Sequence, residues 1–529
     1  MGIKEAFADE VEFAPVLTFS EEDLKDSQHV LTTIVSPHTG KQVNITSDVD
    51  EAMKYAIANA NSNVHLDAAR DKKLLRKIDL YLMPILCLLY CFQYMDKTTN
   101  SYAAILGLRT DLKMEGTMYA WTGSAFYIGY LFFEFFSARL LQRFPVAKTA
   151  SVFIILWGIV LCLHSVPNYT GFVALRTILG MLESSVTVFN LIITGFFYKR
   201  EEVFFRCALW FSSNGIGTII GSGAIAYNVY TDQDNFSVPA WKLIFIITGC
   251  LTIFLGFIFL IHVPDVPTKA WFLNEEERIL VVERIRQNQQ GYGNKHFKWY
   301  QFREAVLDFK TWLIFMFALA TNIPNGGITN FGSILLHEDF GFSTQKTLLM
   351  QMPGGAVEFV GCTLLAYFSG YIKSRMLWSC IGTGIAVAAE CMLAFGSNKH
   401  IQYAGLTLYM ICPIGFICLL SVISSNVAGH TKKVTVNAIF LIGYCVGNLI
   451  GPQTFLPQQA PNYPTAKICI VSFGSLSLVC LMLIWYSYWR ENIKRDKLTS
   501  EAAEKFELIE NHEFADLTDK ENPLFRYAL

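Results

Sequence analysis

Long apolar stretches, separated by short polar segments, run through most of this chain. We count about twelve of them, and each is long enough to cross a bilayer as a helix. They are expected at residues 79–101, 118–138, 148–166, 170–197, 204–228, 241–262, 311–335, 346–370, 376–396, 403–425, 434–455 and 466–488. The pattern therefore predicts an all-α polytopic membrane protein with twelve transmembrane helices.

A longer polar loop divides these spans into two groups of six. The expected domains are an N-terminal segment (1–77), a first six-helix half (78–262), a middle loop (263–310), a second six-helix half (311–488) and a C-terminal tail (489–529). Such a layout is typical of the two repeated halves of a secondary transporter.

Lysine and arginine residues gather on one side of the predicted membrane. Lys72 and Lys73 precede the first span, Arg278 and Arg284 lie in the middle loop, and Arg490 follows the last span. Cytoplasmic loops carry an excess of these residues. We therefore expect both termini and the middle loop to be cytoplasmic.

The polar segments carry two further signals. Residues 274–277 (Asn-Glu-Glu-Glu) resemble a capping box, which predicts a short helix through Arg286 that ends at Gly291 and braces or links the halves. Residues 1–77 are polar and acidic and lack the apolar core of a signal peptide. The first span is therefore expected to direct insertion into the membrane.

The composition agrees with a membrane protein. Of the 529 residues, 53% are hydrophobic and only 16% are charged, whereas a soluble domain carries about 25% charged residues. The net charge of −2 gives no indication of nucleic-acid binding. The 13 cysteines lie in apolar segments without a CxxC pair, so we interpret them as small hydrophobic residues.

An arginine and a glutamate interrupt the apolar span 170–197. Arg176, Gly180 and Glu183 share one helix face, because seven residues make nearly two turns. An ionisable residue near the bilayer centre costs at least ~2.5–3.5 kcal/mol and normally faces the protein interior or a water-filled cavity. Two on one face indicate a polar pathway, and the alternative is an ion pair that only holds helices together.

Other ionisable residues are candidates for transport chemistry. Asp96 and Lys97 lie toward the end of the first span, as an interfacial pair or as a substrate or proton site. Glu134 and Glu358 are each surrounded by apolar residues, where small environmental changes decide whether a carboxyl group is charged. That property suits proton coupling, and the alternative is a satisfied structural carboxylate. Glu390, near the end of its span, is a weaker candidate.

Residues 322–327 (Asn-Ile-Pro-Asn-Gly-Gly) lie near the middle of the seventh span. Proline removes a backbone donor, and the two glycines loosen the next turn of the helix. A discontinuous helix at this depth exposes backbone groups that bind substrate. The amides of Asn322 and Asn325 suit carboxylate, ureido or amide groups. The alternative is a gating kink without substrate contact.

Several classes of protein are not indicated. There is no G-x-x-x-x-G-K-[ST] sequence, which argues against an ATP-driven pump, and no His-Glu-x-x-His motif of a metal-dependent enzyme. No cofactor, metal site or enzymatic activity is therefore expected. Asn235 begins a glycosylation sequon in a loop predicted to face outside.

The chain resembles the fungal allantoate permease family, within the anion:cation symporter group of the major facilitator superfamily. The matching segments are 94–97, 106–113, 124–130, 176–183, 285–291, 322–327, 451–454 and the tail 516–527. One departure is the loop after the second span. There the superfamily's usual Gly-x-x-x-Asp-Arg-x-Gly-Arg is replaced by 137–145 (Ser-Ala-Arg-Leu-Leu-Gln-Arg-Phe-Pro).

The resemblance implies a twelve-helix fold and proton-driven import of small organic anions at the plasma membrane. The substrates it implies are allantoate, ureidosuccinate and small peptides, with nicotinate and pantothenate importers as relatives. A monomer in the lipid bilayer is expected. Rival interpretations are a nutrient receptor without transport and an exporter of the same fold.

From the residues and the resemblance together we assign two sets of candidates. Those for substrate binding are Arg176, Lys97, Asn322 and Asn325, and those for proton coupling are Glu183, Asp96, Glu134 and Glu358.

Overall fold

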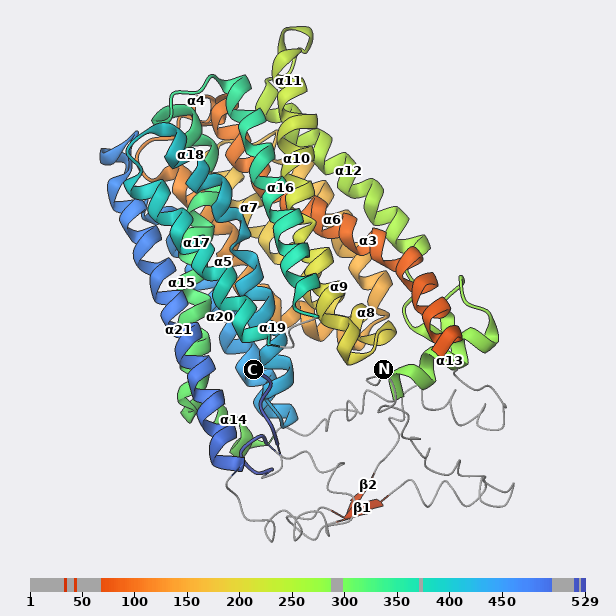
Figure 1. Cartoon of the computed structure of the whole chain (residues 1–529). Helices are drawn as coiled ribbons and strands as arrows, with labels where there is room; N and C mark the ends of the chain where they lie inside the picture. The colour runs from red at the N-terminus through yellow and green to blue at the C-terminus, as the bar shows by residue number, and fades with distance from the viewer. Residues whose placement is uncertain are drawn as a thin grey trace, which may run out of the picture.

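The computed structural model describes residues 33–35, 42–44, 68–286, 298–370, 374–496, 518–522 and 525–529. These residues are nearly all helical, as the apolar pattern predicts (Figure 1). One short antiparallel strand pair, β1 (Thr33–Val35) with β2 (Gln42–Asn44), precedes the bundle.

The first half contains the helices that precede the middle loop. Their bounds are α3 (Ala68–Ala103), η1 (Ala104–Leu108), α4 (Arg109–Asp111), α5 (Met118–Arg143), α6 (Val146–Leu163), α7 (Tyr169–Glu183), α8 (Ser185–Phe197), α9 (Arg200–Ser212), α10 (Asn214–Ile219), η2 (Ile220–Ala226), α11 (Tyr227–Thr231), η3 (Gln233–Asn235) and α12 (Ala240–His262). Successive pieces such as α7 and α8 continue one another and form single spans.

The second half has a similar series of spans. Its bounds, with those of the middle loop, are η4 (Pro267–Lys269), α13 (Glu275–Arg286), α14 (Trp299–Leu307), α15 (Phe309–Ile334), η5 (Leu335–Asp339), α16 (Thr344–Phe368), α17 (Arg375–Phe395), α18 (Lys399–Leu408), η6 (Tyr409–Ile411), α19 (Pro413–Asn426), α20 (His430–Gln453), η7 (Pro457–Gln459) and α21 (Pro464–Asp496).

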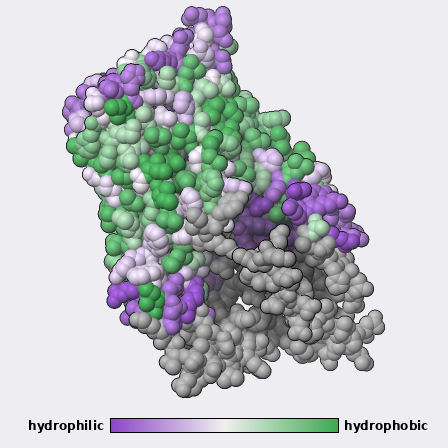
Figure 2. Space-filling view, in the orientation of Figure 1, coloured by the Kyte–Doolittle hydropathy of each residue, from purple (hydrophilic) through white to green (hydrophobic). Residues whose placement is uncertain are grey.

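Ten helical runs among the described residues are long and apolar enough to cross a membrane. An eleventh is added if α14 and α15, which meet at a 64° bend, are taken as one span. We count α5 as the twelfth because its 26 residues pack between α7 and α20, although Glu134 lowers its hydropathy. Figure 2 shows apolar side chains along the sides of the bundle and hydrophilic ones toward its ends.

The middle loop contains the helix that its capping sequence predicts. Helix α13 begins at Glu275, and the Glu277 side chain accepts a hydrogen bond from the backbone N–H of Asn274 at 2.9 Å. This prediction is confirmed, while the expected end at Gly291 lies outside the described residues.

Helix α13 is tied to the first half by ion pairs. Lys77 of α3 pairs with Glu277 at 2.6 Å. The fully buried Arg284 pairs with Asp71 of α3 and, at 2.6 Å, with Glu202 of α9. Helix α13 of the middle loop is therefore held against the first half.

The two ends of the described bundle differ in what they carry. In Figure 1 the start of α3, helices α13 and α14, and the described C-terminal residues lie at the lower end, whereas α4 and α11 lie at the upper end. Asn235 is exposed in the loop that follows α11. Its use as a glycosylation site stays a prediction.

Candidate functional site

Arg176 and Glu183 of α7 lie on one buried face, as the seven-residue spacing predicts. Arg176 is 1% exposed and Glu183 is 0% exposed, and Gly180 between them is also buried. A Cβ atom on Gly180 would collide with the backbone carbonyl of Phe126 in α5. The glycine therefore allows α7 and α5 to approach closely at the level of both charges.

The Arg176 side chain contacts α5 but uses only part of its hydrogen-bonding capacity. Its Nε donates to the backbone carbonyl of Thr122 at 3.1 Å, and its guanidinium lies 5.3 Å from the centroid of the Phe126 ring. One terminal nitrogen, Nη1, is buried and has no hydrogen-bond partner. An unpaired donor on a buried arginine requires an explanation, and a bound anion is one.

Lys97 brings a second buried cation to the same aromatic surface. It is 9% exposed, and its Nζ lies 5.3 Å from the ring centroid of Phe126 and 5.6 Å from that of Tyr127. The Tyr127 hydroxyl is also buried and has no hydrogen-bond partner. The two cations thus face the same turn of α5.

Asp96 and Lys97 are both buried in the bundle and do not lie at a helix end. Helix α3 continues to Ala103 and through η1 and α4 to Asp111, so both residues lie inside the helical run. Asp96 is fully buried, and one of its oxygens accepts hydrogen bonds at 2.8 Å from Trp157 of α6 and Thr252 of α12. Asp96 and Lys97 therefore contact different helices.

The Glu183 carboxylate completes the group of charges. Neither of its oxygens has a hydrogen-bond partner of normal geometry, and its polar neighbours are Lys97, Arg176 and the Gln93 amide. Two cations and the two carboxylates of Asp96 and Glu183 sum to zero when all four are ionised. The first half therefore holds a neutral set of buried charges with unused donors and acceptors, which we name the charge cluster (Asp96, Lys97, Arg176 and Glu183).

The amides of the second half are arranged differently. Asn448 of α20 donates to Asn322 Oδ1 at 3.0 Å and accepts from Asn325 Nδ2 at 3.2 Å. Asn322 also donates to the Ala318 carbonyl at 2.7 Å, and Asn325 accepts from the Thr329 hydroxyl at 3.4 Å. This amide cluster (Asn322, Asn325 and Asn448) satisfies most of its own hydrogen bonds, and only Asn325 is partly exposed.

The expected break in the seventh span does not occur. Helix α15 runs without interruption from Phe309 to Ile334 with Pro324 inside it. Gly326 instead allows close packing, because a Cβ atom there would lie 2.6 Å from the backbone carbonyl oxygen of Asn448 in α20. The proline and glycines thus shape the contact of α15 with α20 and do not expose backbone groups by unwinding.

Glu358 and Glu134 lie apart from the charge cluster. Glu358 of α16 is buried with one oxygen unpartnered. One turn away, Gly355 faces the backbone carbonyl of Gly215 in α10, so Glu358 lies where the two halves pack together. Glu134 of α5 is largely buried one turn beyond Tyr130, whose ring is 6.0 Å from that of Tyr444 in the second half.

Sequence reasoning missed three parts of this site on α5. The carbonyl of Thr122 and the rings of Phe126 and Tyr127 contact the cations, but no pattern in α5 distinguishes them from ordinary core residues. The only available signal was that Phe126 and Tyr127 fall in a segment that matches the resembled family.

The fold agrees with comparisons to known proteins. The model of the Major Facilitator Superfamily matches residues 86–452. An uncharacterized transporter of Schizosaccharomyces pombe is 49% identical over 91% of this chain and 94% of its own. The allantoate permease of Saccharomyces cerevisiae is 45% identical over 96% of both chains.

A solved structure shares the fold at low sequence identity. A bacterial homologue of the human lysosomal transporter Spinster, in an inward-facing and occupied conformation, superposes with a TM-score of 0.54. It is 15% identical, and the match covers 77% of this chain and 96% of that protein.

Proposed function

Because the chain belongs to the Major Facilitator Superfamily, we propose that it imports a small organic anion together with a proton. Allantoate or a related ureido acid, such as ureidosuccinate or a dipeptide, is the proposed substrate, which the 45% identity to the S. cerevisiae allantoate permease supports. The observation that carries the proposal is the charge cluster, where buried charges retain unused hydrogen-bonding atoms.

Arg176 and Lys97 are the proposed anion-binding residues. A guanidinium presents paired N–H groups that match the two oxygens of a carboxylate. Arg176 Nη1 is unpartnered, and Lys97 lies over the same ring of Phe126. A substrate carboxylate at this position satisfies both cations, with the Tyr127 hydroxyl as a further donor.

Glu183 is the proposed proton site, and the charges explain the coupling. With all four groups ionised the charge cluster is neutral, and protonation of Glu183 leaves one net positive charge. A monovalent anion then restores neutrality in a site of low dielectric, where an uncompensated charge is costly. Proton and anion binding therefore favour each other, and the thermodynamic coupling is reciprocal.

The other carboxylates have weaker claims to this role. Asp96 already accepts two hydrogen bonds from α6 and α12, which fits a fixed anion that balances the cations. Glu358 and Glu134 lie near contacts between the halves, so each is a candidate for proton handling during the conformational change. Glu358 is the stronger of the two because it is more deeply buried.

The amide cluster is proposed to bind the uncharged part of the substrate. Ureido groups carry both donors and acceptors, which suit asparagine side chains. Asn325 is the partly exposed member and makes long hydrogen bonds of 3.2 to 3.5 Å, whereas Asn322 and Asn448 hold its position. The two halves then rock about a substrate bound between them.

We further propose a plasma-membrane monomer with both ends in the cytoplasm. The bias of lysine and arginine supports this orientation. Import of another carboxylate nutrient, such as nicotinate or pantothenate, is the second candidate for the function, since the charge cluster recognises a carboxylate of any origin. A receptor that binds without transport and an exporter are the remaining alternatives.

Uptake of labelled allantoate tests this proposal. Cells without their own allantoate uptake should accumulate it faster at acidic than at neutral external pH, and a protonophore should abolish the difference. Arg176→Gln protein present at the surface in equal amount is the control. Absence of uptake by surface-localised protein would reject allantoate, and a panel of nicotinate, pantothenate and dipeptides would follow. Binding without uptake would favour the receptor.

A further inference from the structure

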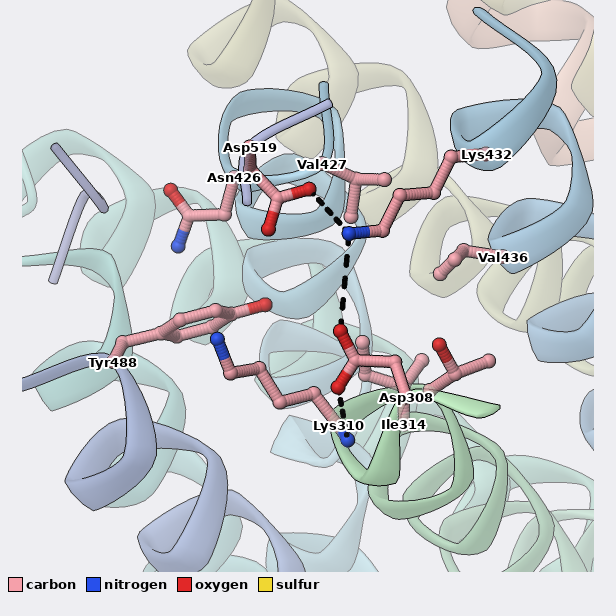
Figure 3. A pocket seen from close by; sticks show the side chains of 10 residues that line it. Asp308, Lys310, Ile314, Asn426, Val427, Lys432, Val436, Tyr488 and Asp519 are labelled. Atoms are coloured by element: carbon pink, nitrogen blue, oxygen red, sulfur yellow. Dashed lines mark hydrogen bonds and ion pairs between the residues drawn. The ribbon is translucent and has the colours of Figure 1, made fainter. Parts of the chain in front are cut away.

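The C-terminal residues lie across the helix ends of the second half. Among the described residues, 518–522 and 525–529 contact side chains from the ends of α15, α19, α20 and α21 (Figure 3). Figure 3 shows Asp519 directed toward Lys432 and toward the space between Lys310 and Tyr488. We name these C-terminal residues the tail segment.

A buried ion pair lies at the centre of this contact. Lys432, at the start of α20, is 2% exposed and pairs with Asp519 at 2.6 Å and with Glu304 of α14 at 2.8 Å. Lys520 pairs with Asp308, at the start of α15, at 2.9 Å. The tail segment thus supplies charges of both signs to two helix ends.

Tyr527 fills the apolar side of the same contact. Its ring stacks on Tyr488 of α21 with centroids 4.9 Å apart, and the Lys310 Nζ lies 4.3 Å from its centroid. Its hydroxyl donates to Asp519 Oδ2 at 2.7 Å. Burial and the adjacent Asp519 carboxylate raise the pKa of Tyr527, so the hydroxyl remains a donor.

Two asparagines bind the tail backbone in both directions. Asn492 of α21 donates to the Tyr527 carbonyl at 2.9 Å and accepts from the Tyr527 N–H at 3.0 Å. Asn426 of α19 makes the same pair of bonds with Ala528, at 2.9 and 2.8 Å. Such paired bonds fix both the position and the direction of a peptide, as a neighbouring strand does.

We propose that the tail segment is a clasp that holds the helix ends of the second half together as one rigid body. Its partners come from α15, α19, α20 and α21, and the backbone N–H of Arg375 adds α17 through the Leu529 carbonyl. All of these partners belong to the second half. The clasp therefore stays closed while the two halves move relative to each other.

Opening of the clasp is measured with purified full-length protein. In an Ala528→Cys background, Asp519→Ala or Tyr527→Ala should raise the rate of maleimide labelling at this cysteine by about tenfold, the effect of losing a hydrogen bond to a charged group. In cells that express the same variants, uptake per molecule at the surface should fall in parallel. Lys494→Ala, which removes an exposed pair with Glu491 within α21, is the matched control. Unchanged labelling and uptake in both variants would overturn the proposal.

A cross-link separates a permanent clasp from one that must open. Oxidation of an Asn426→Cys/Ala528→Cys protein joins the tail segment to α19, and each single variant is a control. We expect the cross-linked protein to transport at the rate of its reduced form. Arrest upon oxidation, reversed by reductant, would show that the tail segment detaches during transport and would contradict a clasp that stays closed.

Discussion

The charge cluster and the amide cluster treat their buried polar groups in opposite ways. The charge cluster of the first half leaves Arg176 Nη1 and both oxygens of Glu183 without hydrogen bonds, whereas the amide cluster of the second half satisfies itself. Unpaired buried charges are costly, so they persist where a ligand or a proton completes them. The difference supports the proposal that the charge cluster recognises the charge of the substrate and that the amide cluster contributes neutral hydrogen bonds.

The largest effect is expected when the charge cluster loses its arginine. Arg176→Gln removes a buried cation and leaves the negative charges of Glu183 and Asp96 in excess. The free-energy barrier to transport should rise by roughly 2–5 kcal/mol, so uptake should fall to or near background. Arg176→Lys keeps the charge without the paired N–H groups and should retain a measurable part. Initial uptake rates, normalised to surface protein, check both. Normal uptake by Arg176→Gln would remove Arg176 from the site.

At Glu183 we expect a substitution to separate substrate exchange from proton-driven accumulation. Glu183→Gln imitates the protonated carboxyl, so the anion should still bind and exchange across the membrane, but without a proton to release. We expect counterflow of labelled substrate to persist while pH-driven accumulation is lost. Proton-driven accumulation by this variant would transfer the coupling role to another carboxylate, and Glu358→Gln in the same assay is the comparison.

A smaller effect is expected in the amide cluster. Asn325→Ala should raise the KM for a ureido acid by roughly 5- to 30-fold, which corresponds to about 1–2 kcal/mol for a lost hydrogen bond. A plain carboxylate such as nicotinate, if transported, should be affected less. Ser379→Ala, which removes a buried hydrogen bond to the Gly415 carbonyl away from the amide cluster, is the matched control, because its loss should lower thermal stability without this discrimination. Equal KM changes for both substrates would contradict the division between the halves.

The smallest effect is expected where the halves meet at the end that carries α4. Arg109 of the first half pairs with Glu338 of the second at 2.7 Å, and their side chains are 37% and 31% exposed. Such a pair contributes about 0–1 kcal/mol and weakens with salt. We propose that this end faces outside and that the pair helps to keep it closed, so Arg109→Gln should lower the KM for external substrate by no more than about fivefold. High ionic strength should do the same to the unaltered protein, and an unchanged KM in both cases would exclude a gating role.

The periodicity of the sequence was sufficient to predict the helical spans and one face of the charge cluster. The apolar spans are observed as helices, and the common face of Arg176 and Glu183 follows directly from 3.6 residues per turn. The predicted boundary of the first span was wrong, because polar residues were interpreted as the end of the helix. The polar run that begins at Asp96 lowered the hydropathy and suggested a boundary, but these side chains find partners on α5, α6 and α12 inside the bundle.

Other features depend on neighbours that a single sequence does not identify. Pro324 suggested a break, yet α15 continues through it, and Gly326 serves the contact with Asn448. The acceptor for Arg176 is a backbone carbonyl, at Thr122, which every residue possesses. Only the packing of α7 against α5 makes this one significant.

The ion pairs of Arg284 also set an order of events during synthesis. Asp71 and Glu202, which belong to the first and fifth spans, gain their common partner only after residue 284 has left the ribosome. All six spans of the first half are therefore synthesised before Arg284, which ties two of them together, has been translated. The tail segment is likewise translated after the spans of the second half that it joins. In each half, contacts between spans are completed by residues that follow them in the sequence. Products that stop between residues 262 and 284 should lack the Arg284 pairs, so that Asp71 keeps its pair with Lys199 and Glu202 keeps its hydrogen bond from the Lys199 backbone N–H.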